Sequence, residues 1–126
     1  MNSPVQYTPG SGLNSFAGKP DEFLHGEDTP SNYLDRCLDS INAQEPEVKA
    51  WVTTRLDAVR TEAAAADRRY ASGTPLSPVD GIPVGIKDVI QTRDMPTKFG
   101  SPIFDNNETR FDSASVDALR RAGALI

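Results

Sequence analysis

One lysine, Lys87, interrupts an apolar stretch that runs from residue 82 to residue 90. The apolar members of this stretch are Ile82, Val84, Ile86, Val89 and Ile90. Such a β-branched run predicts a strand covered on both faces, which begins after Pro83 because proline cannot donate to a sheet ladder. Burial of a lysine lowers its pKa, since it disfavours the charged ammonium. Lys87 is therefore a candidate general base, because a lysine that is neutral near pH 7 can accept a proton.

The same pattern also allows a structural role for Lys87. A lysine at a strand end can pack its aliphatic stem and extend its ammonium to water, or pair with the neighbouring Asp88. Buried charges often belong to structural ion-pair networks. Asp88 is accordingly a candidate supporting partner of Lys87 and is not itself assigned a catalytic role.

Four segments around and after Lys87 resemble the amidase signature family in order and spacing. They are residues 81–88 (GIPVGIKD), 96–101 (PTKFGS), 112–116 (DSASV) and 122–126 (AGALI). The resemblance covers roughly residues 31–126, and the DMPT sequence at 94–97 is similar to the malonamidase-like branch. In that family the lysine of the GIKD motif belongs to a Ser–cis-Ser–Lys triad. The resemblance thus implies that Lys87 is catalytic and that the activity is hydrolysis of a small carboxylic amide to acid plus ammonia or amine.

The two serines of that triad have no counterpart in this sequence. The family carries them in a Gly- and Ser-rich loop beyond the segment that matches residues 122–126, and no two serines are adjacent here. Ser101, Ser113 and Ser115 are isolated and are predicted to be turn and cap residues. We expect the chain to be inactive alone and to need the remainder of the amidase chain, or a second polypeptide, for both serines. The alternative is a non-catalytic or subunit fragment that acts as a binding or assembly module.

Helical patterns surround the Lys87 stretch and predict an α/β fold. The first helix should begin at Thr29–Pro30 and end within residues 42–46; its apolar face is Leu34, Cys37, Leu38 and Ile41. A second should run from about residue 54 to 72, and a third should follow a cap at Asp112 or Ser113. Residues 124–126 should then pair with the Lys87 strand. These elements correspond to the N-terminal helices and first strands of a mixed-sheet amidase signature fold, incomplete in this chain.

Residues 1–28 are rich in proline and glycine and show no apolar period, which predicts an extended or flexible N-terminal extension. Residues 29–126 are then the N-terminal part of an amidase signature domain. His25, the single histidine, has no neighbours at metal-ligand spacing and is predicted to lie on the surface. Trp51 is predicted to contribute packing.

Composition narrows the class of protein further. A net charge of −5 and a pI near 4.7 argue against nucleic-acid binding. The single cysteine, Cys37, excludes an internal disulfide and fits a reducing compartment, so we expect a cytoplasmic protein. No apolar run approaches the roughly 20 residues of a membrane span. No ligand cluster predicts a metal or an organic cofactor.

Overall fold

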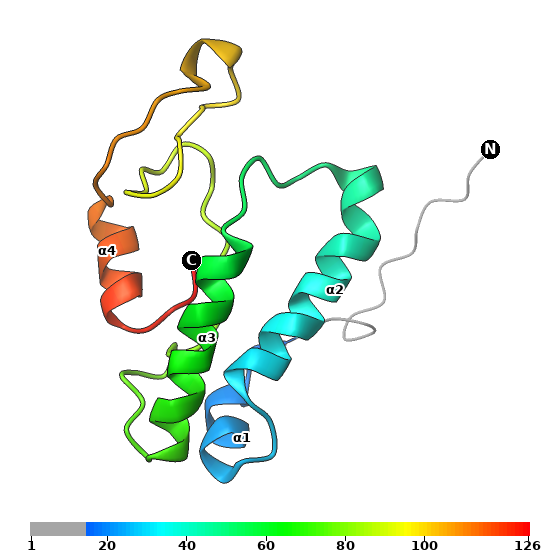
Figure 1. Cartoon of the computed structure of the whole chain (residues 1–126), viewed down its shortest axis with the longest axis vertical. Coiled ribbons are helices and arrows are strands. Elements are labelled where there is room, and N and C mark those ends of the chain that lie inside the picture. Colours follow the sequence, from blue (N-terminus) through cyan, green and yellow to red (C-terminus); the bar gives the residue numbers. More distant parts are fainter. Residues whose placement is uncertain (1–14) are drawn as a thin grey trace, which may run out of the picture.

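Helices make up most of the regular structure in the computed structural model, which describes residues 15–126 (Figure 1). The elements are α1 (Lys19–His25), α2 (Pro30–Val48), α3 (Leu56–Ala71), the 3₁₀ turn η1 (Pro102–Phe104) and α4 (Ala114–Arg121). Helices α2 and α3 lie side by side, and α1 packs at one end of this pair. The chain end lies between α3 and α4, beside the segment that carries Lys87.

Helix α2 begins where the sequence predicts and ends later. Thr29 Oγ1 accepts a hydrogen bond from the N–H of Asn32 at 3.1 Å, so Thr29 is the N-cap. The predicted stop within residues 42–46 is wrong, because the helix continues through Pro46 to Val48. Pro46 has no N–H to donate to the preceding turn, and the helix ends two residues after it. The Glu45 carboxylate then accepts hydrogen bonds from the next two free N–H groups, those of residues 50 and 51.

The contact between α2 and α3 depends on small side chains. Ala63 and Ala66 have no exposed surface, and they let the two helix backbones approach closely. Leu34 from α2 packs there against Val59 of α3, in a cluster that also contains Leu125. The predicted apolar face of α2 is thus confirmed, and this core connects the helices to the last residues of the chain.

Residues 19–25 form a helix, although the sequence predicts an extended or flexible segment there. Phe23, on α1, is 3% exposed and lies between two aromatic rings, 6.2 Å from that of Tyr33 and 5.2 Å from that of Tyr70. A helix of two turns is too short to show an apolar period, which explains the wrong expectation. Residues 1–14 of the predicted extension lie outside the described residues, and the boundary at residue 28 stays a prediction.

The strand predicted over residues 82–90 is reduced to one parallel bridge, Pro83 with Leu125. The N–H of Leu125 donates to Ile82 O at 2.9 Å, and the N–H of Val84 donates to Leu125 O at 2.8 Å. Pro83 is tolerated because this pairing does not use its nitrogen. The predicted pairing of residues 124–126 is therefore confirmed. The longer strand is wrong, because no described segment pairs with residues 85–90 as a sheet neighbour.

Helix α4 follows the predicted cap. Ser113 Oγ accepts the N–H of Val116 at 3.4 Å, which selects Ser113 rather than Asp112 as the N-cap. Val116 is fully buried and packs with Ala124 and Ile126. Among the helices of residues 15–126, none has the length and apolar character needed to cross a membrane.

Candidate active site

The side chain of Lys87 is exposed, which corrects the expectation of a buried lysine. Its ammonium forms no hydrogen bond or ion pair with any residue of the described range 15–126. The cause is that no segment among residues 15–126 pairs as a strand with the residues after Val84 and covers them. Val89 and Ile90, predicted to be buried in the same strand, are 50% and 37% exposed.

The backbone on either side of Lys87 is nevertheless held in place. Its carbonyl accepts hydrogen bonds from the N–H of Val89 at 2.7 Å and from that of Ile90 at 2.9 Å, which closes a tight turn. On the preceding side, Val84 is bonded to Leu125. Lys87 thus projects from a short segment between two anchored points.

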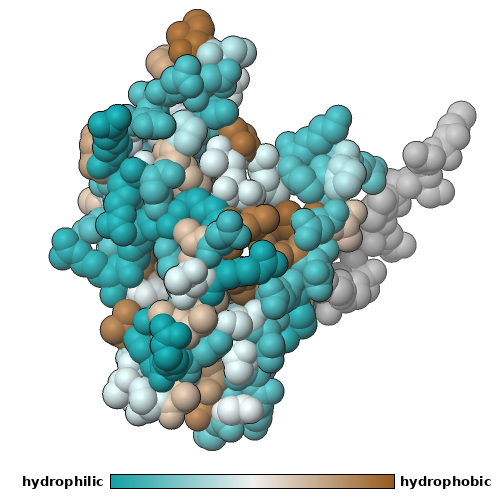
Figure 2. Space-filling model, in the orientation of Figure 1, coloured by the Kyte–Doolittle hydropathy of each residue, from teal (hydrophilic) through white to brown (hydrophobic). Residues whose placement is uncertain are grey.

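Trp51 contacts this segment directly, as its predicted packing role requires. A Cβ built on Gly85 would lie 2.9 Å from Trp51 Cη2, so the indole lies against the glycine backbone. Trp51 also borders a shallow pocket at the end of α2, together with Ile41 and Val48. Figure 2 shows apolar surface gathered between α2 and α3 on this face of the molecule.

The carboxylate of Asp88 binds backbone and not Lys87. Asp88 Oδ1 accepts the N–H of Lys98 at 2.6 Å, and Oδ2 lies 3.4 Å from the N–H of Gly100. The carbonyl of Asp88 accepts the N–H of Phe99 at 3.0 Å. The structural alternative, in which Asp88 pairs with Lys87, is therefore wrong for this structure. Asp88 bonds to backbone, as a catalytic Lys87 requires, and joins the Lys87 turn to residues 98–100.

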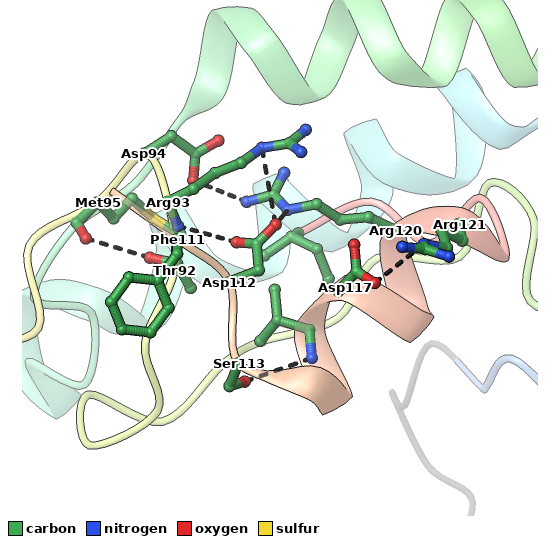
Figure 3. A network of polar contacts seen from close by, with 12 residues as sticks. Thr92, Arg93, Asp94, Met95, Phe111, Asp112, Ser113, Asp117, Arg120 and Arg121 are labelled. Atoms are coloured by element: carbon green, nitrogen blue, oxygen red, sulfur yellow. Dashed lines mark hydrogen bonds and ion pairs between the residues drawn. The ribbon is translucent and has the colours of Figure 1, made fainter. Parts of the chain in front are cut away.

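Charged side chains hold the loop after this turn onto α4 (Figure 3). Arg120, on α4, donates to Asp94 Oδ1 at 2.7 Å and lies 3.0 Å from Asp112 through its Nε. Asp112 Oδ1 also accepts the N–H of Arg93 at 2.8 Å. Arg55 binds the other oxygen of Asp94 at 2.9 Å. Two arginines from different parts of the chain therefore share one carboxylate beside the loop.

A buried ion pair lies before the Lys87 segment, at Asp80. This carboxylate has no exposed surface and binds Arg69 of α3, while the carbonyl of Asp80 accepts the hydroxyl of Tyr70 at 3.0 Å. Sequence reasoning assigned no role to Asp80. The signal was available, because Asp80 borders the same apolar motif as Lys87 and a carboxylate there needs a partner.

The other side chains considered from the sequence behave as structural groups. Ser113 is a helix cap, and Ser115 Oγ lies 3.1 Å from its hydroxyl. Ser101 accepts the N–H of Phe104 through its carbonyl, which makes it a turn residue. Burial raises the pKa of the Cys37 thiol, as expected for an unreactive cysteine. His25 is exposed, with Nδ1 2.8 Å from Asp21 O.

Solved structures with a similar backbone include those of a peptide amidase. The native peptide amidase from Stenotrophomonas maltophilia superposes with a TM-score of 0.81 at 28% identity, covering 93% of this chain and 24% of that chain. A vestigial protein complex related to an s-triazine catabolic enzyme matches with a TM-score of 0.80 at 26% identity, covering 88% of this chain and 24% of that chain. These similarities confirm the predicted fold, the N-terminal part of the amidase signature fold.

Curated relatives lead to the same family. A glutamyl-tRNA(Gln) amidotransferase subunit from Chloroflexus aggregans is 40% identical over 101 residues, which is 80% of this chain and 21% of the relative. The corresponding chloroplastic/mitochondrial protein from Zea mays is 32% identical over 120 residues, 94% of this chain and 22% of the relative. The chain thus spans about a fifth of the length of these relatives. The family model named Amidase matches residues 32–126, so this chain belongs to the amidase family.

Proposed function

We propose that the complete protein hydrolyses a small carboxylic amide to an acid plus ammonia or an amine, and that Lys87 is its catalytic base. The observation that carries the proposal is the exposure of Lys87 on an anchored turn, in a chain that belongs to the amidase family. Its ammonium is exposed and free of any carboxylate within residues 15–126, on a turn whose backbone is anchored on both sides. An unpaired lysine on a rigid support is suited to exchange a proton with an incoming group.

In this proposal, Lys87 acts on a serine nucleophile through a second, bridging serine. A serine hydroxyl is a weak nucleophile and needs a base within hydrogen-bond reach. Neutral Lys87 would take the proton from the bridging serine, which takes it from the nucleophile, and would later return it to the leaving amine. Backbone N–H groups near the nucleophile would stabilise the oxyanion. This chain supplies the lysine of the Ser–cis-Ser–Lys triad only.

Both serines belong, in our proposal, to the remainder of the amidase chain or to a second polypeptide. The small part of its relatives that this chain matches supports the proposal, since the matched residues make up 21% of the Chloroflexus protein. That relative is named as one subunit of an amidotransferase, and the s-triazine structure is described as a protein complex, so both also fit assembly with other polypeptides. Exposed Val89 and Ile90 offer an apolar surface that such a polypeptide would cover.

The added polypeptide has a second task, which is to bury Lys87. A base must be the neutral amine, because a lysine ammonium only donates hydrogen bonds and has no lone pair to accept a proton. Removal of water from around the ammonium would favour the neutral base.

We place this assembly in the cytoplasm, because a single cysteine fits a reducing compartment. The malonamidase-like substrate preference stays a prediction.

The test is reconstitution of the activity from its parts. We expect the 126-residue chain alone to release no ammonia from malonamate or benzamide, and a mixture with a polypeptide that carries the Gly/Ser loop to release it. Lys87→Ala should abolish this turnover, whereas Lys98→Ala, at a nearby lysine that pairs with Asp105, should preserve it. Turnover by the chain alone would contradict the account. Persistent binding of the added polypeptide without any turnover would favour the assembly module instead.

A further inference from the structure

We propose that Asp88 is a positioning residue for Lys87, because it holds residues 98–100 and thereby holds the turn from which the lysine projects. The inference rests on the proposed role of Lys87 as the base. It adds a residue that does not touch the reacting atoms and that acts through the backbone.

Asp88 receives three successive backbone donors. The N–H of Lys98 reaches Oδ1 at 2.6 Å, the N–H of Phe99 reaches the carbonyl at 3.0 Å, and the N–H of Gly100 faces Oδ2 at 3.4 Å. The first bond is short, and the last is long and weaker. One residue therefore joins two backbone segments that are ten positions apart in the chain.

The loop that Asp88 holds is not in a relaxed conformation. Phe99 has a φ of +53° and Gly100 a φ of +67°, so two consecutive residues occupy the left-handed region. Glycine accepts this conformation, whereas a bulky aromatic residue is rarely found there. Contacts must compensate for it, and Phe99 has two: its N–H is bound by Asp88, and its ring packs edge-on against Phe104 with centroids 5.3 Å apart.

The link from Asp88 to Lys87 is covalent and short. Asp88 lies inside the turn that the Lys87 carbonyl closes with the N–H groups of Val89 and Ile90. A residue that is bound through both its carbonyl and its carboxylate cannot rotate freely, so its neighbour in the turn is restrained too. Pairing of Val84 with Leu125 restrains the other side. The base would thus enter the assembled site with its backbone already in place, which lowers the cost of ordering it.

The same geometry keeps a counter-ion away from the base. A carboxylate in contact with a lysine favours the charged ammonium, which would oppose its use as a base. Both oxygens of Asp88 face the backbone N–H groups of Lys98 and Gly100 instead. Asp88 therefore offers neither carboxylate oxygen to the Lys87 ammonium in this structure.

Amide hydrogen exchange in the 126-residue chain tests the contact itself. We expect exchange at the N–H groups of Lys98 and Gly100 to be at least tenfold faster in Asp88→Ala. In Asp88→Asn, which keeps one carbonyl oxygen as an acceptor, the effect should be intermediate. The matched control is Asp105→Asn, at an exposed carboxylate 3.6 Å from the Lys98 ammonium, which should leave both rates within twofold. Unprotected amides in the natural chain, or equal rates in Asp88→Ala, would overturn the proposal.

Kinetics of the complete protein test the consequence for the base. We expect Asp88→Ala to lower kcat at least tenfold per folded molecule, with KM within threefold, and Asp88→Asn to recover part of the loss. If Asp88→Ala does not fold, Asp88→Asn carries the comparison. A normal kcat in the folded variants would overturn the positioning role and leave only a structural one. If Lys87→Ala is fully active, the proposed function fails, while the exchange rates still report on the Asp88 contact.

Discussion

Arg69 binds the carboxylate of Asp80 through two hydrogen bonds, Nε to Oδ2 at 2.8 Å and Nη2 to Oδ1 at 2.5 Å, and Asp80 has no exposed surface. The N–H of Leu76 adds a third bond to Oδ2 at 2.9 Å. The hydrogen bond to Asp80 raises the pKa of Arg69 above its ordinary value. This pair fastens α3 to the residue just before Gly81, where the Lys87 segment begins.

Replacement of the arginine should therefore be costly. Arg69→Met keeps the aliphatic stem but leaves the Asp80 carboxylate buried without its cation, and we expect a loss of about 3 kcal/mol in the free energy of unfolding. Arg68→Met, at the exposed neighbour on the same helix, should stay within about 0.5 kcal/mol of the natural chain. Urea denaturation of both variants measures the difference. Equal midpoints for the two variants would show that the buried pair does not stabilise the fold.

Gly123 is the second position where the Asp80 site restricts the sequence. Its φ is +91°, and a Cβ there would lie 2.3 Å from Asp80 Oδ1 and 3.1 Å from Asp80 Cα. We expect Gly123→Ala to cost more than about 3 kcal/mol, because overpacking and left-handed strain combine.

The matched substitution is Gly73→Ala, with a φ of +69° and no atom within 4 Å of the added Cβ. Left-handed strain alone should cost it about 1 kcal/mol. Thermal unfolding of both variants separates the two contributions. A Gly73→Ala variant that is destabilised as much as Gly123→Ala would mean that the close approach to Asp80 does not matter.

Acid should weaken the junction between α1 and α2 through Asp28. Burial alone would raise the pKa of this carboxyl, but hydrogen bonds from Arg36, the N–H of Thr29 and Lys19 outweigh it and lower the pKa from 3.8 to about 2. Because this pKa is lower in the folded state than in the unfolded chain, the ionised carboxylate stabilises the fold at pH values above the unfolded pKa. That stabilisation is lost as the pH falls from about 4 to 2. We expect about 1–2 kcal/mol from this residue at pH 6.

The measurement is the urea midpoint of the natural chain and of Asp28→Asn between pH 6 and pH 2.5. The gap between them should narrow as the pH falls below 4. Asp35→Asn, at an exposed carboxylate 3.6 Å from Arg60, serves as the control. A gap for Asp28→Asn that is the same at every pH would show that its ionised form is not what stabilises the junction.

Local signals in the sequence predicted α2, α3 and α4 but not α1, since helix caps and apolar periods depend on nearby residues and a two-turn helix shows no period. Thr29 and Ser113 cap their helices as expected, and Gly73 follows α3 with a positive φ. The strand over residues 82–90 could not be predicted in the same way, because a strand exists only where another segment pairs with it. In the described residues that partner is limited to residues 124–126.

The sequence singles out Lys87, the proposed base, but does not predict the contacts around it. Lys87 stands out by type and position, and the family resemblance names it. The contact of Asp88 with residues 98–100 depends on how a loop folds back over ten positions, and the pairing of Arg69 with Asp80 depends on how α3 packs. Neither contact is visible as a spacing in the sequence. The sequence does place an acidic residue at each end of the Lys87 motif, Asp80 and Asp88, and a carboxylate beside an apolar run needs a partner.

The most direct test of the catalytic role is kcat of Lys87→Arg in the complete protein, with folding checked by circular dichroism. Arginine keeps the positive charge and much of the length, but it cannot give up a proton in a protein. If Lys87 is the base, Lys87→Arg should lose about as much activity as Lys87→Ala, on the order of 10²–10⁴-fold. A Lys87→Arg enzyme that keeps more than about a tenth of the natural kcat, well short of the loss expected for a removed base, would contradict the account.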